Sequence, residues 1–357
     1  MNKEIEMFLQ LIRLGIGNGT ITHYYVGVLW EKVKALSDQH GLSAVLVDGI
    51  ENLPENNRPP QEQLLQWIGE LLQGFEYRYE AYKRAIAELG GFYNPRGYQM
   101  MVLKGYVCSL DWPKPEHRPC GDIDIWLCGK QKEADIALTA EKGIRIDKSH
   151  HHHTVFCWQD FMVENHYDFV NTSSHKSSRN LEVIFKELGK DYSHFIEVFG
   201  QRIYLPSPNL HALFLIRHNM NHFASSEINL RQLLDWAFFV KRHGKEVDWL
   251  WLESILEQFG MKKLYDTFNA ICVEDLGFEV NIFTRVQFEP LLKERVLKEI
   301  LVPKYSNVLP SNIFKRVYYK YRRWKANDWK RKLCYNESAW SSFWTGVISH
   351  LMKPSSI

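Results

Sequence analysis

Residues 116–128 read EHRPCGDIDIWLC, and Asp122 and Asp124 interrupt what is otherwise the apolar pattern of a buried strand. Because side chains alternate along a strand, both acids point to one face, with Cα atoms about 6.5–7 Å apart, while Ile123 and Ile125 point into the core. Two carboxylates this close repel each other unless protons or a cation lie between them. A divalent ion is the economical solution, since Mg²⁺ is commonly held by one or two carboxylates together with substrate phosphates.

A third carboxylate is available in the stretch FMVENHYDFV at 161–170. Strand alternation places Glu164, His166 and Asp168 on one polar face. We expect Glu164 to bind a second metal ion or to accept the proton of an acceptor hydroxyl. In this interpretation His166 holds or orients Glu164, and Asp168 is the alternative acid.

Upstream of the aspartates, the residues VLKG at 102–105 end a predicted strand and place Lys104 and Gly105 at the turn into a helix. A glycine there lets backbone N–H groups approach a phosphate, and the lysine and a helix N-terminus both favour anions. The DxD pattern alone is equally well explained as a strand end whose acids bond to loop amides or to Arg118. Its combination with Lys104-Gly105 favours a metal and phosphate site.

These residues, in this order, resemble the DNA-polymerase-beta-type nucleotidyltransferase superfamily. More narrowly, the sequence resembles a broad bacterial nucleotidyltransferase family whose members carry LKG, R…DIDI, an acid-x-His strand, and a helical C-terminal half with two histidines and a later aspartate. The matching positions are Leu103, Lys104, Gly105, Arg118, Asp122, Asp124, Glu164, His166, His218, His222 and Asp235. The likeness runs from about residue 80 to residue 245.

The resemblance implies that a nucleoside monophosphate is transferred from an NTP to an acceptor hydroxyl, with pyrophosphate released and Mg²⁺ or Mn²⁺ required. It implies that Asp122, Asp124 and Glu164 are the catalytic metal ligands. The substrate-binding residues would be Lys104, Gly105, Arg118, His166, His218, His222 and Asp235. The superfamily usually has a Gly-Ser pair in the turn before its DxD, where this chain has Lys104-Gly105 and a longer connection to the acids.

Hydrophobic periodicity divides the 357 residues into three regions. Residues 1–95 have helical spacing, and their second helical stretch is expected to stop at Gly90-Gly91. Residues 96–205 alternate short strands (YQMMVLKG, GDIDIWL, HHHTVFCW and FMVENHYDFV) with the helix KQKEADIALTAEKG, and residues 206–357 return to helical spacing. The predicted fold class is α+β: a small mixed β-sheet nucleotidyltransferase domain between an N-terminal helical region and a C-terminal helical domain.

Composition narrows the setting of the protein. A formal charge of +2 is too balanced to indicate a nucleic-acid partner over the whole surface. No run approaches the roughly 18 apolar residues of a transmembrane helix, and the first residues lack the basic start and cleavage site of a signal peptide. The six cysteines show no framework spacing, which fits a reducing cytoplasm.

Three polar features are open to more than one interpretation. The histidine run 150–153, if it lies on a strand, alternates its rings between the two faces. These histidines could be residues of an edge strand or loop, contacts to the acceptor or to phosphate, or ligands of a transition metal. His218 and His222 lie four apart on one helical face, where they pack against the sheet domain or contact nucleotide or acceptor. Arg231 and Asp235 have the same spacing and form either an intrahelical ion pair or part of a closing cleft.

The segment FKRVYYKYRRWKANDWKRKLCY at 314–335 is strongly basic, with aromatic residues between its charges. Such a composition suits single-stranded nucleic acid, because cations neutralise phosphates and aromatic rings stack on bases. It also suits an interfacial helix on anionic lipid, or a solvated helix whose aromatic side chains pack on the domain.

We therefore expect a cytoplasmic, Mg²⁺-dependent or Mn²⁺-dependent nucleotidyltransferase that uses ATP or another NTP in a cleft between the α/β domain and the C-terminal helices. The acceptor hydroxyl is left open among small molecules, glycan precursors, proteins and RNA. The alternative is a non-catalytic module of the same fold that senses NTP or binds RNA. The presence of all three acids favours the enzyme, because a binding module has no need of them.

Overall fold

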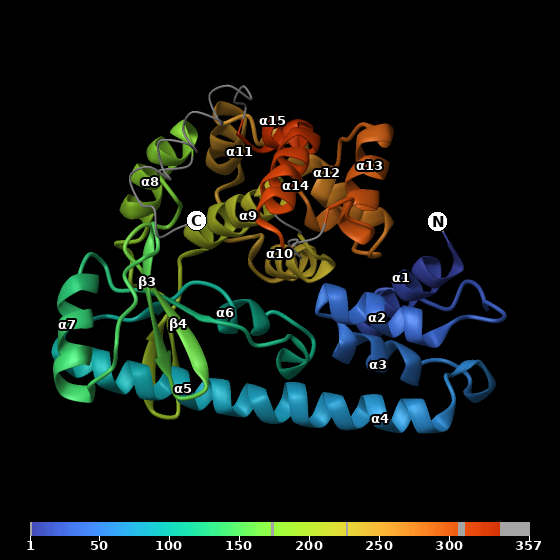
Figure 1. The fold of residues 1–357 in the computed structure, drawn as a ribbon, viewed down its shortest axis with the longest axis horizontal. Coiled ribbons are helices and arrows are strands. Elements are labelled where there is room, and N and C mark those ends of the chain that lie inside the picture. Colours follow the sequence, from blue (N-terminus) through green and yellow to red (C-terminus); the bar gives the residue numbers. More distant parts are fainter. Residues whose placement is uncertain (1, 173–174, 226–227, 306–310, 336–357) are drawn as a thin grey trace.

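The computed structural model describes residues 2–172, 175–225, 228–305 and 311–335. Within these ranges the chain is mostly helical and carries a six-stranded mixed sheet, with helices before and after it (Figure 1). The predicted α+β class is confirmed.

The chain begins with three packed helices, α1 (Lys3–Gly15), α2 (Trp30–His40) and α3 (Ser43–Glu51). Glycines let α1 and α3 approach closely. A Cβ atom at Gly15 would lie 2.1 Å from the carbonyl oxygen of Val45, and one at Gly49 would lie 2.1 Å from that of Leu11. Any larger residue at either position would push the two helices apart.

A long helical segment follows, in which α4 (Gln61–Leu71), a π-helical turn (Leu72–Tyr77) and α5 (Arg78–Tyr93) run end to end under the rest of the molecule in the view of Figure 1. The predicted stop at Gly90-Gly91 is wrong, because α5 continues through both residues and the chain turns at Gly97, where φ is +76°. Gly90 instead permits close packing on the sheet, since a Cβ there would lie 2.6 Å from Ile203 Cδ1.

The sheet has the spatial order β3-β4-β2-β1-β6-β5. Its strands are β1 (Met101–Val102), β2 (Ile123–Trp126), β3 (His153–Trp158), β4 (Phe161–His166), β5 (Phe195–Val198) and β6 (Gln201–Tyr204). β2 is parallel to β4 and β1 is parallel to β6, whereas the other neighbours are antiparallel. The four predicted strand stretches contain β1 to β4, and the hairpin β5–β6 was not predicted.

The two faces of the sheet differ in character. On one face, Ile123 and Ile125 of β2 and Val163 of β4 are buried in a hydrophobic cluster with side chains of α5 and α7 (Gln131–Lys142). The predicted inward direction of the two isoleucines is therefore confirmed. The opposite face carries the acids of β2 and β4 and is turned toward the C-terminal helices.

After β4 the chain is mostly helical, with the hairpin β5–β6 between α8 and α9. The elements are α8 (Lys176–Leu188), α9 (Pro208–Ser225), α10 (Leu230–His243), α11 (Trp249–Gln258), α12 (Lys262–Glu274), α13 (Pro290–Leu301), α14 (Ile313–Ala326) and α15 (Asp328–Tyr335). A reciprocal capping box between Asn229 and Gln232 fixes the start of α10. Buried side chains of α8 to α13 and of α15 belong to one hydrophobic cluster with those of α1 and α3, so the N-terminal helices and these later helices share a core.

A charged cluster around the buried His117 ties the N-terminal helices to the loop before β2. His117 Nδ1 lies 2.6 Å from Asp48 Oδ2 on α3, and its Nε2 lies 3.3 Å from Glu76 Oε1. Lys114 also pairs with Asp48. Burial opposes protonation of the imidazole, but the two carboxylates outweigh it and raise the pKa of His117.

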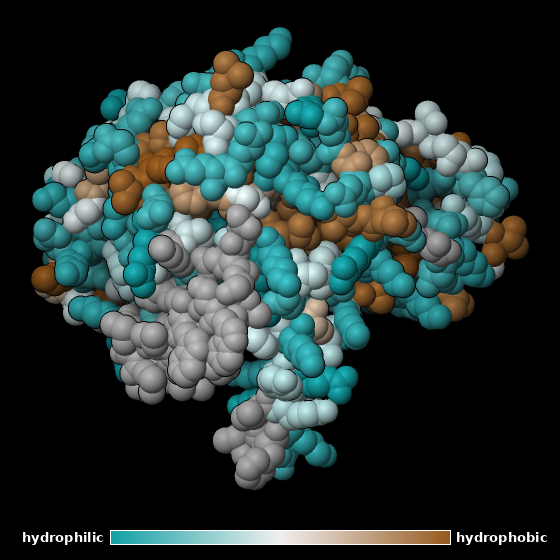
Figure 2. All heavy atoms as spheres, turned by 90° about the horizontal axis from the view of Figure 1, so that it is seen from above, coloured by the Kyte–Doolittle hydropathy of each residue, from teal (hydrophilic) through white to brown (hydrophobic). Residues whose placement is uncertain are grey.

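Seen from above, hydrophilic side chains cover most of the face of the molecule, with smaller groups of hydrophobic side chains between them (Figure 2). Within the described ranges, none of the helices has the length and apolar content that crossing a membrane requires.

Candidate active site

The pairing of β2 with β4 places two of the predicted acids next to each other. In this parallel ladder, Asp124 is the register partner of Glu164. Asp122 lies immediately before β2 and is exposed, whereas Asp124 is buried. The alternative acid Asp168 follows the end of β4 and forms an ion pair with Lys186 of α8. Glu164 is therefore the acid that stands beside the DxD pair.

Two cationic side chains lie between the acids. Lys104 Nζ is 2.9 Å from Asp124 Oδ1, and His166 Nε2 is 3.0 Å from the same oxygen and 3.5 Å from Glu164 Oε2. Burial disfavours a charged imidazole, but hydrogen bonds to Asp124 and Glu164 outweigh it and raise the pKa of His166 to about 9. The pKa of Glu164 is lowered because His166 and Lys104 offset its desolvation.

Asp122 has the opposite electrostatic balance. Although Asp122 is exposed to the cavity, desolvation by the surrounding protein, followed by the charges of Glu164 and Asp124, raises its pKa. Lys104 and His166 therefore do not neutralise all of the negative charge that surrounds Asp122. A bound cation is favourable under this condition.

Gly105 shapes the turn that brings Lys104 to the acids. Its φ of +65° lies in the left-handed region, and a Cβ atom there would lie 2.5 Å from Tyr82 Oη. The Tyr82 hydroxyl donates a hydrogen bond to the carbonyl oxygen of Asp122 at 2.7 Å, so α5 fixes the backbone of the DxD segment through this contact. The helix expected after Gly105 is the single turn α6 (Tyr106–Ser109), which is too short to supply a strong helix dipole.

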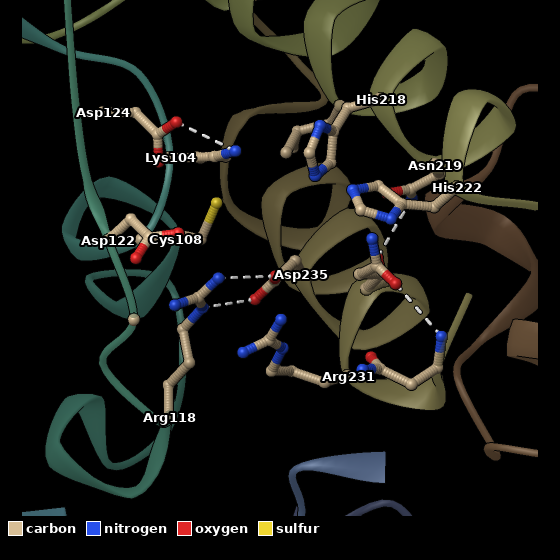
Figure 3. A pocket seen from close by; sticks show the side chains of 15 residues that line it. Lys104, Cys108, Arg118, Asp122, Asp124, His218, Asn219, His222, Arg231 and Asp235 are labelled. Carbon is tan, nitrogen blue, oxygen red and sulfur yellow. Dashed lines mark hydrogen bonds and ion pairs between the residues drawn. The ribbon is translucent and has the colours of Figure 1, made fainter. Parts of the chain in front are cut away.

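Arg118 and Asp235 form a buried ion pair that joins the loop before β2 to α10. Arg118 Nε and an Nη atom donate to the two Asp235 oxygens at 2.7 and 2.9 Å (Figure 3). Trp112 Nε1 also donates to Asp235, at 2.9 Å. Asp235 thus pairs across the fold with Arg118. The intrahelical pair with Arg231 is not formed.

Arg231 lines the site, which matches the second of the two alternatives left open for it, a place in the cleft and not an intrahelical ion pair with Asp235. Its Nε is buried and has no hydrogen-bond partner among the residues that the structure describes. Burial, followed by the charge of Arg118, lowers its pKa, which indicates that this guanidinium lies in an environment short of negative charge. Figure 3 shows it beside Asp235 in the same cavity.

His218 and His222 lie on α9, opposite Lys104 and Asp124 (Figure 3). Their ring centroids are 4.4 Å apart. Burial and then the charge of Lys104 lower the pKa of His222 to about 4 and that of His218 well below its ordinary value. Both rings are therefore neutral at physiological pH and offer hydrogen bonds without adding charge.

Two adjoining cavities, of about 360 and 500 Å³, meet at the acids. Both are lined by Lys104, Asp122, His218 and His222. The smaller one, which we call the arginine lobe, also contains Arg118, Asn219, Asn229, Arg231, Gln232 and Asp235. The larger one, the histidine lobe, also contains His152, His153, Glu164, His166, Phe169, His175, Phe214 and Tyr335. All ten predicted site residues thus lie along the walls of this double cavity.

The histidine run departs from the predicted alternation. β3 begins only at His153, so the preceding histidines are not in strand geometry. His150 stacks on His153 with ring centroids 4.7 Å apart, and His152 contacts His153 at 4.4 Å. Neither pairing follows from alternation, which had placed His150 and His153 on opposite faces.

The donor set fits a divalent cation. One atom each from Asp124, Glu164 and His166 lies within 4.8 Å of the others, and the Asp122 carboxylate lines the same space. Three carboxylates match the oxygen preference of Mg²⁺ and Mn²⁺.

A mixed sheet that presents carboxylates from adjoining parallel strands, beside a lysine and across a cavity from a helical domain, defines the class of nucleotide-transferring enzymes. The chain belongs to the family described as "uncharacterised nucleotidyltransferase", which matches residues 27–276. No curated protein and no solved structure matches the chain. Membership of this family implies transferase activity with an NTP as substrate.

Proposed function

We propose that the protein transfers a nucleoside monophosphate from an NTP to the hydroxyl group of an acceptor and releases pyrophosphate. The observation that carries the proposal is the strand register that places Asp124 beside Glu164, with Asp122 two residues before Asp124, at the junction of two cavities. A purely structural strand has no need of these acids, whose mutual repulsion is costly.

In this proposal Asp122, Asp124 and Glu164 hold Mg²⁺ or Mn²⁺. When bound, the metal supplies charge neutralisation for the triphosphate and activation of the attacking oxygen. The ion pairs that keep Glu164 ionised favour its role as a ligand over that of a proton acceptor. His166, which touches both Asp124 and Glu164, orients the two carboxylates relative to each other.

The two lobes would divide the substrates. The arginine lobe contains Arg231, whose guanidinium Nε lacks a partner within the described ranges, and it therefore suits the triphosphate. Lys104 and Arg118 line the same lobe and add positive charge, although both already pair with aspartates. The histidine lobe, with aromatic and neutral imidazole side chains beside Glu164, suits the acceptor.

Transfer of a radioactive label tests this function. The chain is incubated with each α-labelled NTP, with Mg²⁺ or Mn²⁺, in a fractionated lysate, and the labelled species is identified. We expect Asp122→Asn to lower labelling by at least about a hundredfold. The matched control is Asp160→Asn, an exposed acid at the β3–β4 turn, which should label at the wild-type rate. Equal labelling by both variants would refute the assignment.

We also propose that α14 contacts single-stranded nucleic acid. Tyr318 and Tyr321 are 60% and 53% exposed, with exposed Lys320 and Arg322 beside them, so these rings do not pack on the domain. Exposed rings between cations suit stacked bases and their phosphates.

Fluorescence anisotropy with a labelled single-stranded RNA tests this contact. Binding should weaken steeply with salt, and Tyr318→Ala/Tyr321→Ala should weaken it by about tenfold or more. Tyr77→Ala is the control, because Tyr77 is 77% exposed on the remote π-helical turn. Binding to anionic vesicles with none to RNA would assign the helix to a lipid surface instead.

A further inference from the structure

Three histidines converge on the wall of the histidine lobe. His152 precedes β3, His153 begins β3, and His166 ends β4 as the antiparallel register partner of His153. The ring centroids are 4.4 Å apart for His152 and His153, 5.5 Å for His152 and His166, and 5.2 Å for His153 and His166. One ring nitrogen from each histidine lies within 4.8 Å of the other two.

Two of these rings have nitrogens without a partner. Nδ1 of His152 and Nδ1 of His153 are buried and form no hydrogen bond with any residue that the structure describes, and His153 is only 7% exposed. Leaving a buried polar atom unsatisfied costs about 1–3 kcal/mol, so native proteins rarely retain two of them side by side without a ligand. Core packing alone does not explain this pair, since an apolar residue at either position would avoid the cost.

We propose that His152, His153 and His166 bind a transition-metal ion of the zinc type, at a site that adjoins the carboxylate site and shares His166 with it. The ion takes the place of the proton that His166 shares with Asp124 and Glu164, because an imidazole must be deprotonated to bind a metal. Imidazole nitrogens favour Zn²⁺, Co²⁺ and Ni²⁺, whereas Mg²⁺ favours oxygen ligands. Ligand atoms around a tetrahedral zinc ion lie about 3.3 Å apart. The ring nitrogens lie within 4.8 Å of one another, and rotation of the rings, above all of the partly buried His152, would bring them to this spacing when an ion binds.

The surroundings leave room for further ligands. Glu164 Oε1 lies 3.8 Å from His153 Nε2 and is within reach of a fourth position. The three histidines also line the cavity of about 500 Å³, so an ion there is open to water or to a bound molecule. His166 contacts both the histidine cluster and Asp124, and it therefore connects the two sites. The proposal goes beyond nucleotidyl transfer and does not depend on it, because the ion should bind without any nucleotide.

Cobalt titration of the full chain tests the site. The protein, with any affinity tag removed, is stripped with a chelator and titrated with CoCl₂ while the visible absorption is recorded. ZnCl₂ competition then gives the zinc affinity. We expect a saturable four-coordinate Co²⁺ spectrum that excess MgCl₂ leaves in place. His152→Gln and His153→Gln should each weaken binding by at least about tenfold.

Two controls separate this site from the carboxylates and from general histidine loss. Asp122→Asn removes a carboxylate of the neighbouring site but retains all three histidines and the contact of Asp124 with His166, and it should bind Co²⁺ as the wild type does. His194→Gln, in the loop before β5, should also have no effect. Far-ultraviolet circular dichroism checks the fold of each variant. His152 is only partly buried, so His152→Gln should disturb the fold less than His153→Gln. Wild-type Co²⁺ affinity in both histidine variants, displacement by Mg²⁺, or loss of binding in Asp122→Asn would overturn the proposal.

Discussion

The buried pair between Arg118 and Asp235 gives the sharpest prediction about stability. The two side chains are 6% and 4% exposed and are joined by hydrogen bonds of 2.7 and 2.9 Å. Asp235→Leu would leave the Arg118 guanidinium buried without its partner and next to Arg231. Such an uncompensated charge typically costs about 3–5 kcal/mol. We therefore expect the free energy of unfolding, measured by urea denaturation, to fall by this amount.

The double variant Arg118→Met/Asp235→Leu separates the cost of an orphaned charge from the value of the pair. Apolar replacements of a buried ion pair are often close to neutral. Because Trp112 Nε1 also loses its acceptor, the double variant should lie about 1–3 kcal/mol below the wild type and above Asp235→Leu. As a matched control, Glu187→Gln removes an exposed pair with Lys190 and should leave the urea midpoint unchanged. A double variant as unstable as Asp235→Leu, or a single variant as stable as the wild type, would refute the reasoning.

Three further predictions concern pH, the Lys104 turn and the triphosphate. Because contact with two carboxylates raises the pKa of His117, its contribution to stability is complete below the ordinary pKa of 6.5 and is lost as pH rises through the raised value. The difference in unfolding free energy between wild type and His117→Gln should therefore be larger at about pH 5 than at about pH 9; a gap independent of pH would contradict this. Gly105→Ala introduces a Cβ atom at a residue with positive φ and against the side chain of Tyr82, whereas Gly129→Ala introduces one at a positive φ with open space around it. Gly105→Ala should therefore lower the free energy of unfolding by about 1–3 kcal/mol more than Gly129→Ala. Equal unfolding midpoints would refute the packing argument. Arg231→Met should raise the KM for NTP by about tenfold or more while Arg242→Met, at the exposed end of α10, does not, and equal KM values would remove Arg231 from the triphosphate site.

The sequence was most informative where polar residues interrupt an apolar strand. Asp124 and Glu164 could be assigned to one site because each lies on a strand whose other face is apolar, and the parallel pairing of β2 with β4 then made them neighbours. The inward direction of Ile123 and Ile125 followed from the same alternation.

Other features could not be read from local spacing. Arg118 and Asp235 are 117 residues apart along the chain, and spacing alone favoured the helical neighbour Arg231 as the partner. The hairpin β5–β6 has short strands and no clear alternation, so periodicity did not separate it from a loop. Gly90 looked like a helix stop, but its role depends on Ile203, more than 100 residues away, and tertiary packing decided it.

The central claim is that Asp122, Asp124 and Glu164 hold the metal for transfer of a nucleotidyl group. The most direct measurement compares α-labelled and γ-labelled NTP with wild-type protein and with Asp124→Asn, in Mg²⁺. We predict that the acceptor receives the α label and never the γ label, and that Asp124→Asn reduces this transfer by at least about a hundredfold. Transfer of the γ label, or undiminished transfer of the α label by Asp124→Asn, would contradict the claim.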